Sequence, residues 1–288
     1  MAVEAISVGY GIISVLGWGF GDFISKRIVG SLGYYRFLLY VQLVGLAPLF
    51  LLAAMFTPPL PSSPSTIALI LATAITSVVS LSFFFSGLIV EKVSIISPIT
   101  SASAIVAIVL SFTVLGETLS ALQIACIAMV LGGILALSMR SNSRGGSNKG
   151  IPYAIACMLC AGLNSVLLKL VSIDIGEIGT FVFNRGLVAL LLLMAMPFFG
   201  NPFSRHAERK VSMKTIVAAG LTEFMGFFGF IIGVGVGLVS IVAPVSSASP
   251  AVTVILAQVF LKEKLVYRHK IAIVLIMLGI ILLSILPG

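Results

Sequence analysis

One acidic residue stands in the middle of a long apolar segment of this chain. Glu223 lies about ten residues into the segment 213–236, where a charged side chain costs roughly 3 kcal/mol on membrane-insertion scales. Gly226, Gly229 and Gly233 follow at steps of three and four residues, so they share a helical face with Glu223. A carboxyl group on such a face can bind a proton or a substrate amine. The alternative is a neutral carboxylic acid that is hydrogen-bonded to a neighbouring helix.

A second acidic residue belongs to the first apolar segment. Asp22 lies near the end of the expected span 4–24 and four residues before Lys26, the spacing of an ion pair on a helix. The pattern favours an interfacial ion pair. A place on a substrate pathway beside Trp18 is the alternative.

Two prolines recur at matching places in the two halves of the chain. Pro98 and Pro244 each lie about five residues into an apolar span, where proline removes a backbone donor and opposes a regular helix. Hydroxyl side chains follow directly, among them Ser101 and Ser247. Matching broken helices point to the binding site of a transporter, although a packing kink between small residues would leave the same pattern.

Basic residues close to the ends of apolar segments could attract anions. Lys169 and Arg185 flank a loop that contains Asp174 and Glu177, so a local salt-bridge cluster is the simpler interpretation. The alternative is a charged rim at one mouth of a cavity. Lys26 and Arg36 would then form the matching rim at the other mouth.

Aromatic residues and two glutamates at helix ends are expected to have structural roles. Seven aromatic residues could line a cavity, but most of them are expected to pack against helices or lipid; they are Trp18, Phe83, Phe84, Phe85, Phe227, Phe228 and Phe230. Glu117 and Glu263 each follow an apolar segment in a short loop, which favours helix capping or a turn.

The elements that must position these residues are membrane helices. Hydrophobic residues make up 59% of the 288 residues and charged residues 9%, against about 25% charged residues in soluble domains. Apolar runs of about 20 residues fit helices that cross a bilayer, and strands of a barrel would instead alternate over about ten residues. Ten spans are predicted: 4–24, 34–56, 66–89, 94–115, 119–138, 151–172, 178–199, 213–236, 240–261 and 267–286.

Several classes of protein are disfavoured by the same sequence. Motifs of hydrolases, metalloproteases, P-loop proteins and dinucleotide-binding enzymes are absent, and neither histidine lies in a predicted span. The three cysteines lie in apolar runs and read as small buried side chains. We therefore expect no enzyme activity, metal or other cofactor. The basic residues alternate with apolar spans, which indicates a lipid bilayer as partner rather than nucleic acid.

The two halves of the chain repeat each other. An offset of 146 residues places Pro98 on Pro244 and Glu117 on Glu263, together with the Ser-rich segments that follow the prolines. Offsets of 149 and 143 residues relate Arg36 to Arg185 and Lys26 to Lys169. We divide the chain into a first repeat (1–138), a Gly/Ser-rich linker (139–150) and a second repeat (151–288). Five spans per repeat would insert the two copies in opposite directions, as in many secondary transporters.

The order of these motifs resembles a known family. Trp18-Gly19, Phe23 and Lys26, then Arg36, Ser97-Pro98 and Gly116-Glu117-x-Leu119, resemble EamA-type members of the drug/metabolite transporter superfamily. The second half repeats the pattern with Lys169, Arg185, Pro244 and Glu263-x-Leu265. The resemblance implies ten helices, a central cavity and transport of small metabolites or amino acids. Asp22 stands where the family often has Asn, and Trp18 where the small multidrug exporters of the superfamily carry a glutamate.

The sequence thus predicts an all-α integral membrane protein that moves a small organic solute by alternating access, and Glu223 is the candidate residue for proton coupling. An uncoupled facilitator or exchanger of organic anions is the second hypothesis, and a channel or membrane scaffold is the third. The oligomeric state does not follow from the sequence, and a monomer is compatible with it.

The orientation in the cell membrane can also be predicted. Loops with odd numbers hold 15 of the 17 Lys and Arg residues, and positive charge is retained in the cytoplasm. Both termini should then be extracytoplasmic and the linker cytoplasmic. Relatives in the family are generally drawn the other way round.

Overall fold

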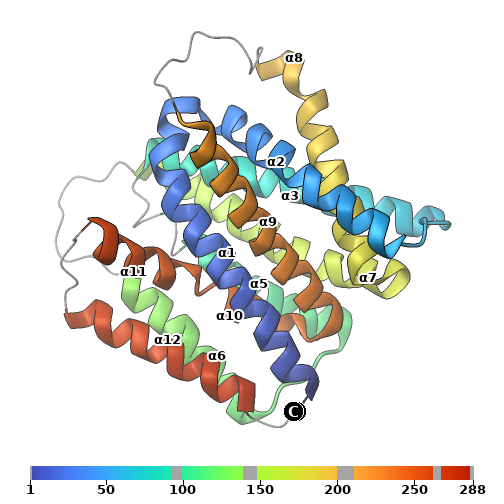
Figure 1. Ribbon diagram of the computed structural model, residues 1–288. Helices are drawn as coiled ribbons and strands as arrows, with labels where there is room; N and C mark the ends of the chain where they lie inside the picture. Colours follow the sequence, from blue (N-terminus) through green and yellow to red (C-terminus); the bar gives the residue numbers. More distant parts are fainter. Residues whose placement is uncertain are drawn as a thin grey trace.

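The computed structural model describes residues 2–91, 96, 99–138, 148–199, 211–261 and 267–285, which are almost entirely helical (Figure 1). The helices are α1 (Ala2–Leu32), α2 (Tyr34–Phe56), α3 (Pro64–Val90), α5 (Ser103–Leu110), α6 (Ala121–Ser138), α7 (Ile151–Met194), α8 (Met196–Phe199), α9 (Met213–Val236), α10 (Val239–Ser246), α11 (Ser249–Leu261) and α12 (Tyr267–Ile285). A π-helical turn, η1 (Ser111–Leu115), extends α5, and a 3₁₀ turn, η2 (Asn148–Gly150), precedes α7.

Within the described residues, seven helical segments are long and apolar enough to cross a bilayer. Residues 99–115 and 121–136 form two shorter apolar helices. Large apolar side chains such as Phe50, Met194 and Phe260 are exposed on the outside of the bundle, as expected where lipid is the solvent. The chain is therefore an all-helical, multi-pass membrane protein.

The ends of two predicted spans differ from expectation. α1 continues through Lys26 and Arg27 to Leu32 and ends before Gly33, which has a φ of 77°. The predicted span ended at residue 24 because charged residues follow. A helix can continue beyond the bilayer with charged residues, so Lys26 and Arg27 do not end α1. The predicted spans 151–172 and 178–199 are joined in α7, which is interrupted at Gly176, with a φ of 73°. Glycine adopts this conformation without the steric cost that other residues meet.

The helix that contains Pro244 is interrupted, but not at the proline. Pro244 lies inside α10, and the turn that separates α10 from α11 is formed by Ser247 and Ala248. In the first half a turn occurs at Ala102, which the 146-residue offset relates to Ala248. Pro98 lies outside the described residues. The two halves therefore share a helix interruption, displaced toward the serines that follow each proline.

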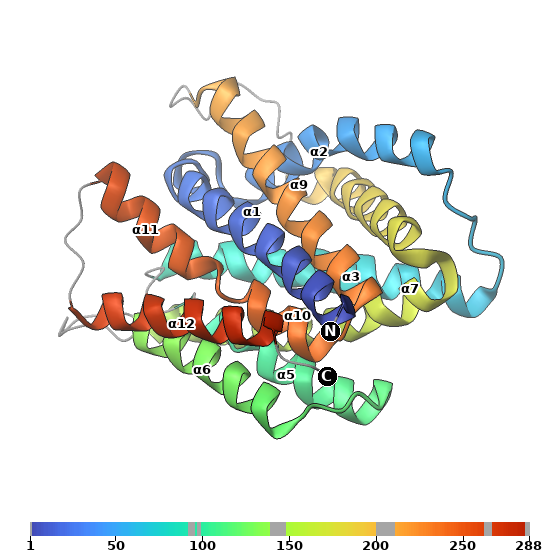
Figure 2. The ribbon, with the colours of Figure 1, turned by 60° about the horizontal axis from the view of Figure 1, so that its bottom comes forward.

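The most extensive helix contacts join the two halves of the chain. α1 packs along α9, α3 along α7, and α6 along α12. Figures 1 and 2 show α6 and α12 side by side, with α1 crossing α9. The first two pairs each join the first helix of one half to the third span of the other. Neither half could complete its packing without the other.

A pair of glycine contacts repeats the same arrangement. A Cβ atom at Gly19 would lie 2.5 Å from Val252 Cβ, and one at Gly162 would lie 2.5 Å from Val106 Cβ. The offsets found in the sequence relate Gly19 to Gly162 and Val106 to Val252. The repeat in the sequence therefore corresponds to a repeat of tertiary contacts.

Candidate substrate cavity

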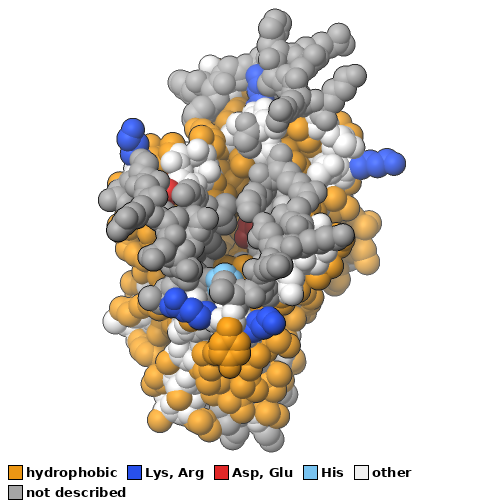
Figure 3. All heavy atoms as spheres, turned by 90° about the vertical axis from the view of Figure 1, so that its left-hand side faces the viewer, with side chains coloured by type: hydrophobic (Ala, Val, Ile, Leu, Met, Phe, Trp, Pro, Cys, Tyr) orange, Lys and Arg blue, Asp and Glu red, His pale blue; other side chains and the backbone are white. Residues whose placement is uncertain are grey.

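A cavity of about 180 Å³ lies where the two halves meet. Its walls come from α1, α3, the residues around the turn at Ala102, the first part of α7, α9, and the α10–α11 turn. Small-molecule sites usually measure about 300–1,000 Å³, so this cavity fits only a small solute. Figure 3 shows a hollow, with an acidic side chain recessed in it, on the side that lies at the left of Figure 1.

Two carboxyl groups line one wall of the cavity. Asp22 comes from α1 and is half-buried, whereas Glu223 comes from α9 and is 6% exposed. A Cβ atom at Gly21 would lie 3.3 Å from Glu223 Oε1, so the backbone of α1 runs beside this carboxyl group. The charge of Asp22 acts on Glu223. Asp22 is thus part of the cavity wall rather than an exposed interfacial residue, while the Lys26 side chain lies outside what the structure describes.

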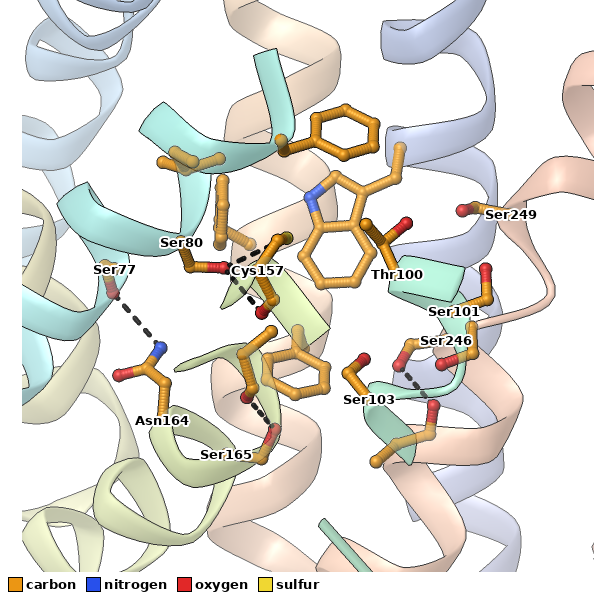
Figure 4. Close-up of a pocket in the computed structure, with 18 of the residues that line it drawn as sticks. Ser77, Ser80, Thr100, Ser101, Ser103, Cys157, Asn164, Ser165, Ser246 and Ser249 are labelled. Atoms are coloured by element: carbon orange, nitrogen blue, oxygen red, sulfur yellow. Dashed lines mark hydrogen bonds between the residues drawn. The ribbon is translucent and has the colours of Figure 1, made fainter. Parts of the chain in front are cut away.

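The opposite walls carry neutral polar groups. Figure 4 shows amide and hydroxyl groups on both sides of the cavity: Ser77, Ser80, Asn164 and Ser165 on one side, and Thr100, Ser101, Ser103, Ser246 and Ser249 on the other. Asn164 Nδ2 donates to Ser77 Oγ over 3.1 Å, and Thr76 Oγ1 donates to Asn164 Oδ1 over 2.8 Å. The cavity can therefore exchange several hydrogen bonds with a polar solute.

The polar residues on α3 and α7 were missed in the sequence, although the repeat contained the signal. The 146-residue offset relates Ser77 to Glu223, and the 143-residue offset relates Ser165 to Asp22. The two carboxyl groups thus occupy positions whose counterparts in the other half carry hydroxyls. The repeat therefore forms two matching walls, one from α1 and α9 and one from α3 and α7. The carboxyl groups lie on the wall formed by α1 and α9.

Most of the aromatic residues lie at the cavity, which was the less favoured of their two expected places. Trp18, Phe84, Phe85, Phe227 and Phe230 all line the cavity. The ring centroids of Trp18 and Phe227 are 5.2 Å apart, and those of Trp18 and Phe230 are 5.3 Å apart. Apolar runs alone do not distinguish a side chain that faces lipid from one that faces an internal cavity.

Arg185 is buried rather than placed on a rim. It is 5% exposed and lies one layer behind the cavity, with its guanidinium carbon 3.8 Å from the ring centre of Phe227. Its Nε and Nη2 donate to Asn184 Oδ1 over 3.0 and 2.8 Å, whereas Nη1 has no partner among the described residues. The charges of Arg185 and Glu223 act on each other. Arg185 therefore provides a positive charge behind the carboxyl pair. The sequence did not predict this arrangement, because Arg185 is far from both carboxyl groups along the chain.

Lys169 is engaged with the backbone. Its Nζ donates to Gly235 O over 2.7 Å and to Gly237 O over 3.0 Å. Glu117, expected to cap a helix, accepts hydrogen bonds from the first residues of α10. The cap was predicted from its place in a loop, but its target in the other half of the chain was not.

The remaining predicted residues divide between the cavity and other places. Ser101 and Ser247 line the cavity. Pro244 is buried in α10 and does not line it. Arg36 lies in the first turn of α2 and is half-buried. Pro98 lies outside the described residues. Within the described part of the chain, no group of three His, Cys, Asp or Glu side chains is placed to hold a metal ion.

Comparison with known proteins agrees with this architecture. The sequence profile of the EamA-like transporter family matches residues 5–139 and again residues 148–285. The chain therefore belongs to the EamA-like transporter family and contains two copies of its repeat. This membership places it among transporters rather than enzymes.

Individual relatives add little about the solute. An uncharacterized transporter of Archaeoglobus fulgidus is 27% identical over 75% of this chain and 78% of its own length. An uncharacterized protein of Methanocaldococcus jannaschii is 59% identical over 17% of this chain; the match spans 36% of that relative. A crystal structure with a TM-score of 0.72 and 18% identity covers 96% of this chain and 95% of its own chain, and supports the fold.

Proposed function

We propose that this protein is a secondary transporter that moves a small, polar, amine-bearing solute by alternating access, with Glu223 as the proton-binding group. The observation that carries the proposal is the cavity between the two halves, in which Asp22 and Glu223 are the charged residues among those that line it. A buried carboxylate requires a countercharge. A solute amine or a proton supplies that charge inside the cavity, while Arg185 compensates part of it from behind Phe227.

Ten membrane crossings in two inverted sets of five agree with the described helices. The break at Gly176 makes two crossings of α7, α10 and α11 together make one, and residues 99–115 and 121–136 add two more. Both chain ends lie at the same side of the bundle in Figure 2, as an even number of crossings requires. Inverted repeats give the two conformations of a transporter a common structural basis.

The test of this function is solute counterflow in proteoliposomes. The single tryptophan of the chain, Trp18, lies in the cavity, so quenching or enhancement of its fluorescence can first identify ligands within a panel of amino acids and small amines. We expect saturable counterflow of the ligands so identified, with net uptake that depends on a pH gradient. Flux that does not saturate and shows no counterflow would indicate a channel instead.

The charge distribution leads to a prediction about orientation. With the termini outside, a cysteine at Ser62, which is exposed between α2 and α3, should react in intact cells with an impermeant maleimide. A cysteine at Ser143, in the linker outside the described residues, should react only after permeabilisation. Both are introduced into a chain without its native cysteines: Cys126, Cys157 and Cys160. The reverse pattern of labelling would establish the opposite orientation, with the termini inside.

An uncoupled carrier of organic anions is the second candidate, and the structure weakens its basis. Lys169 binds backbone carbonyls and Arg185 is buried, so neither presents a free charge at a mouth. We therefore expect anionic solutes neither to change Trp18 fluorescence nor to be exchanged. A carrier of anions would instead show exchange whose apparent KM rises in both Lys169→Ala and Arg185→Ala.

A further inference from the structure

We propose that Glu117 and Lys169 are positioning residues that together close the cavity at one end of the bundle, by holding the two helix ends that meet between α9 and α10. We call residues 235–240 the junction, and the end of the molecule that carries it the junction end. The connection between α2 and α3 also lies at this end, and is seen at the right-hand edge of Figure 1.

Glu117 satisfies the start of α10. The N-cap residue of α10 is Leu238, whose side chain makes no capping hydrogen bond. The carboxylate of Glu117 accepts from Val239 N over 2.8 Å, from Ser240 N over 2.9 Å and from Ser240 Oγ over 2.6 Å. The first backbone N–H groups of a helix have no intrahelical partner and carry partial positive charge. A carboxylate from the other half of the chain thus supplies the cap that Leu238 cannot.

Lys169 satisfies the end of α9 with the opposite charge. Its ammonium group donates to the carbonyl oxygens of Gly235 and Gly237, at the helix end where partial negative charge accumulates. The charges of Glu117 and Glu177 also act on Lys169. Each charged side chain is therefore opposite in sign to the partial charge of the helix end that it contacts.

Local sequence explains how Glu117 reaches its target. The π-helical turn η1 ends at Gly116, which has a φ of 66° and caps the turn. A left-handed residue at a helix end suits glycine and reverses the chain direction. The next residue, Glu117, is thereby directed away from its own helix and toward α10.

The held junction lies between the cavity and the outside. Glu117 and Lys169 border a separate outer pocket of about 510 Å³, together with Leu238. Ser246, at the far end of α10, borders the central cavity, and every residue of α10 is buried. Eight helical residues extend about 12 Å, so α10 fills the space between pocket and cavity. Access from the junction end requires α10 to leave the two side chains that hold it.

The native Cys157 offers a direct test, because it lines the cavity and is 5% exposed. With Cys126 and Cys160 replaced by alanine, labelling of Cys157 by a small, impermeant, cationic thiosulfonate reports whether the cavity is open. The reagent is added to one side of oriented vesicles. A cysteine at Ser62 identifies the vesicles whose junction end faces the reagent. We expect the parent protein to react from the opposite side and to be protected from the junction side.

Removing either charge should open the junction side. We expect Glu117→Gln and Lys169→Met each to raise the labelling rate from that side about tenfold or more, the factor that loss of a charge-assisted hydrogen bond supplies. Ser240→Ala, which removes one of the three bonds to Glu117, should give a smaller increase. Lys169→Arg keeps donors for the carbonyls and should stay protected. Asp174→Asn is the matched control, since this carboxylate accepts from Thr66 and does not contact the junction.

Exchange of the two charges separates helix capping from a simple ion pair. Glu117→Lys combined with Lys169→Glu would place each charge on the wrong helix pole, so we expect the cavity to remain accessible. Restored protection in this double variant would overturn the proposal, as would unchanged protection in folded Glu117→Gln and Lys169→Met. Labelling does not require transport, so these results stand whether or not Glu223 couples a proton.

Discussion

Glu223→Gln should abolish solute uptake driven by a proton gradient and leave solute exchange measurable. The amide has nearly the same shape as the carboxyl group, so the cavity wall is retained, but it cannot release a proton. Glu223 is 6% exposed and lines the cavity beside α1, and an ionisable group buried in a membrane protein most often serves the transport pathway. We expect gradient-driven uptake to fall to the level of protein-free liposomes.

Trp18 provides a readout that does not depend on transport. Its ring lies next to Gly226 on α9, one helical turn from Glu223, so a change in the charge of Glu223 should alter its fluorescence. We expect a pH-dependent transition in the parent protein that is lost in Glu223→Gln and kept in Glu223→Asp. Asp174→Asn, at the periphery of the bundle, serves as the control. Normal gradient-driven uptake by Glu223→Gln at every pH would exclude the coupling role.

Gly226→Ala should lower the stability of the protein, because it adds a methyl group where α1 and α9 are in direct contact. A Cβ atom at Gly226 would lie 2.7 Å from Trp18 Nε1, and one at Gly17 would lie 2.8 Å from Thr222 O and overlap the backbone of Gly226. α1 and α9 could accommodate either methyl group only by moving apart. Overpacking of this kind costs about 1–3 kcal/mol, so we expect a lower unfolding midpoint in detergent and less monodisperse protein.

Gly132→Ala is the matched control for this substitution. Gly132 is also helical, in α6, but a Cβ atom there would meet nothing within 4 Å. The change should therefore leave stability equal or slightly higher, because alanine is the better helix former. If Gly226→Ala and Gly132→Ala had the same unfolding midpoint, the close approach of α1 and α9 would not be needed for stability.

The class of protein was predictable from the sequence because lipid as a solvent leaves a strong signature. Few charges and long apolar runs predict membrane helices. Duplicated Pro, Glu, Lys and Arg residues cannot arise from shared hydrophobicity, so they reveal the repeat and the family. The helix interruption near Pro244 was predictable because proline acts on the backbone close to its own position. A capping role for Glu117 could be expected from its place in a loop, but not that it would cap α10 in the other half of the chain.

What the sequence could not decide is which residues meet across the two halves. Asp22 and Glu223 are about two hundred residues apart, and no local sequence pattern predicts that α1 packs against α9. Arg185 was expected in a local salt-bridge cluster or, as the alternative, on a charged rim, yet it is buried against aromatic and carboxyl groups of α9. Lys169 had the same two expected places, yet it binds the carbonyls of a distant helix end. Composition indicates that lipid is the solvent, and the lengths of the apolar runs indicate the helices. The partners of a buried charge depend on how the two interlocking halves pack, and only the tertiary structure decided that.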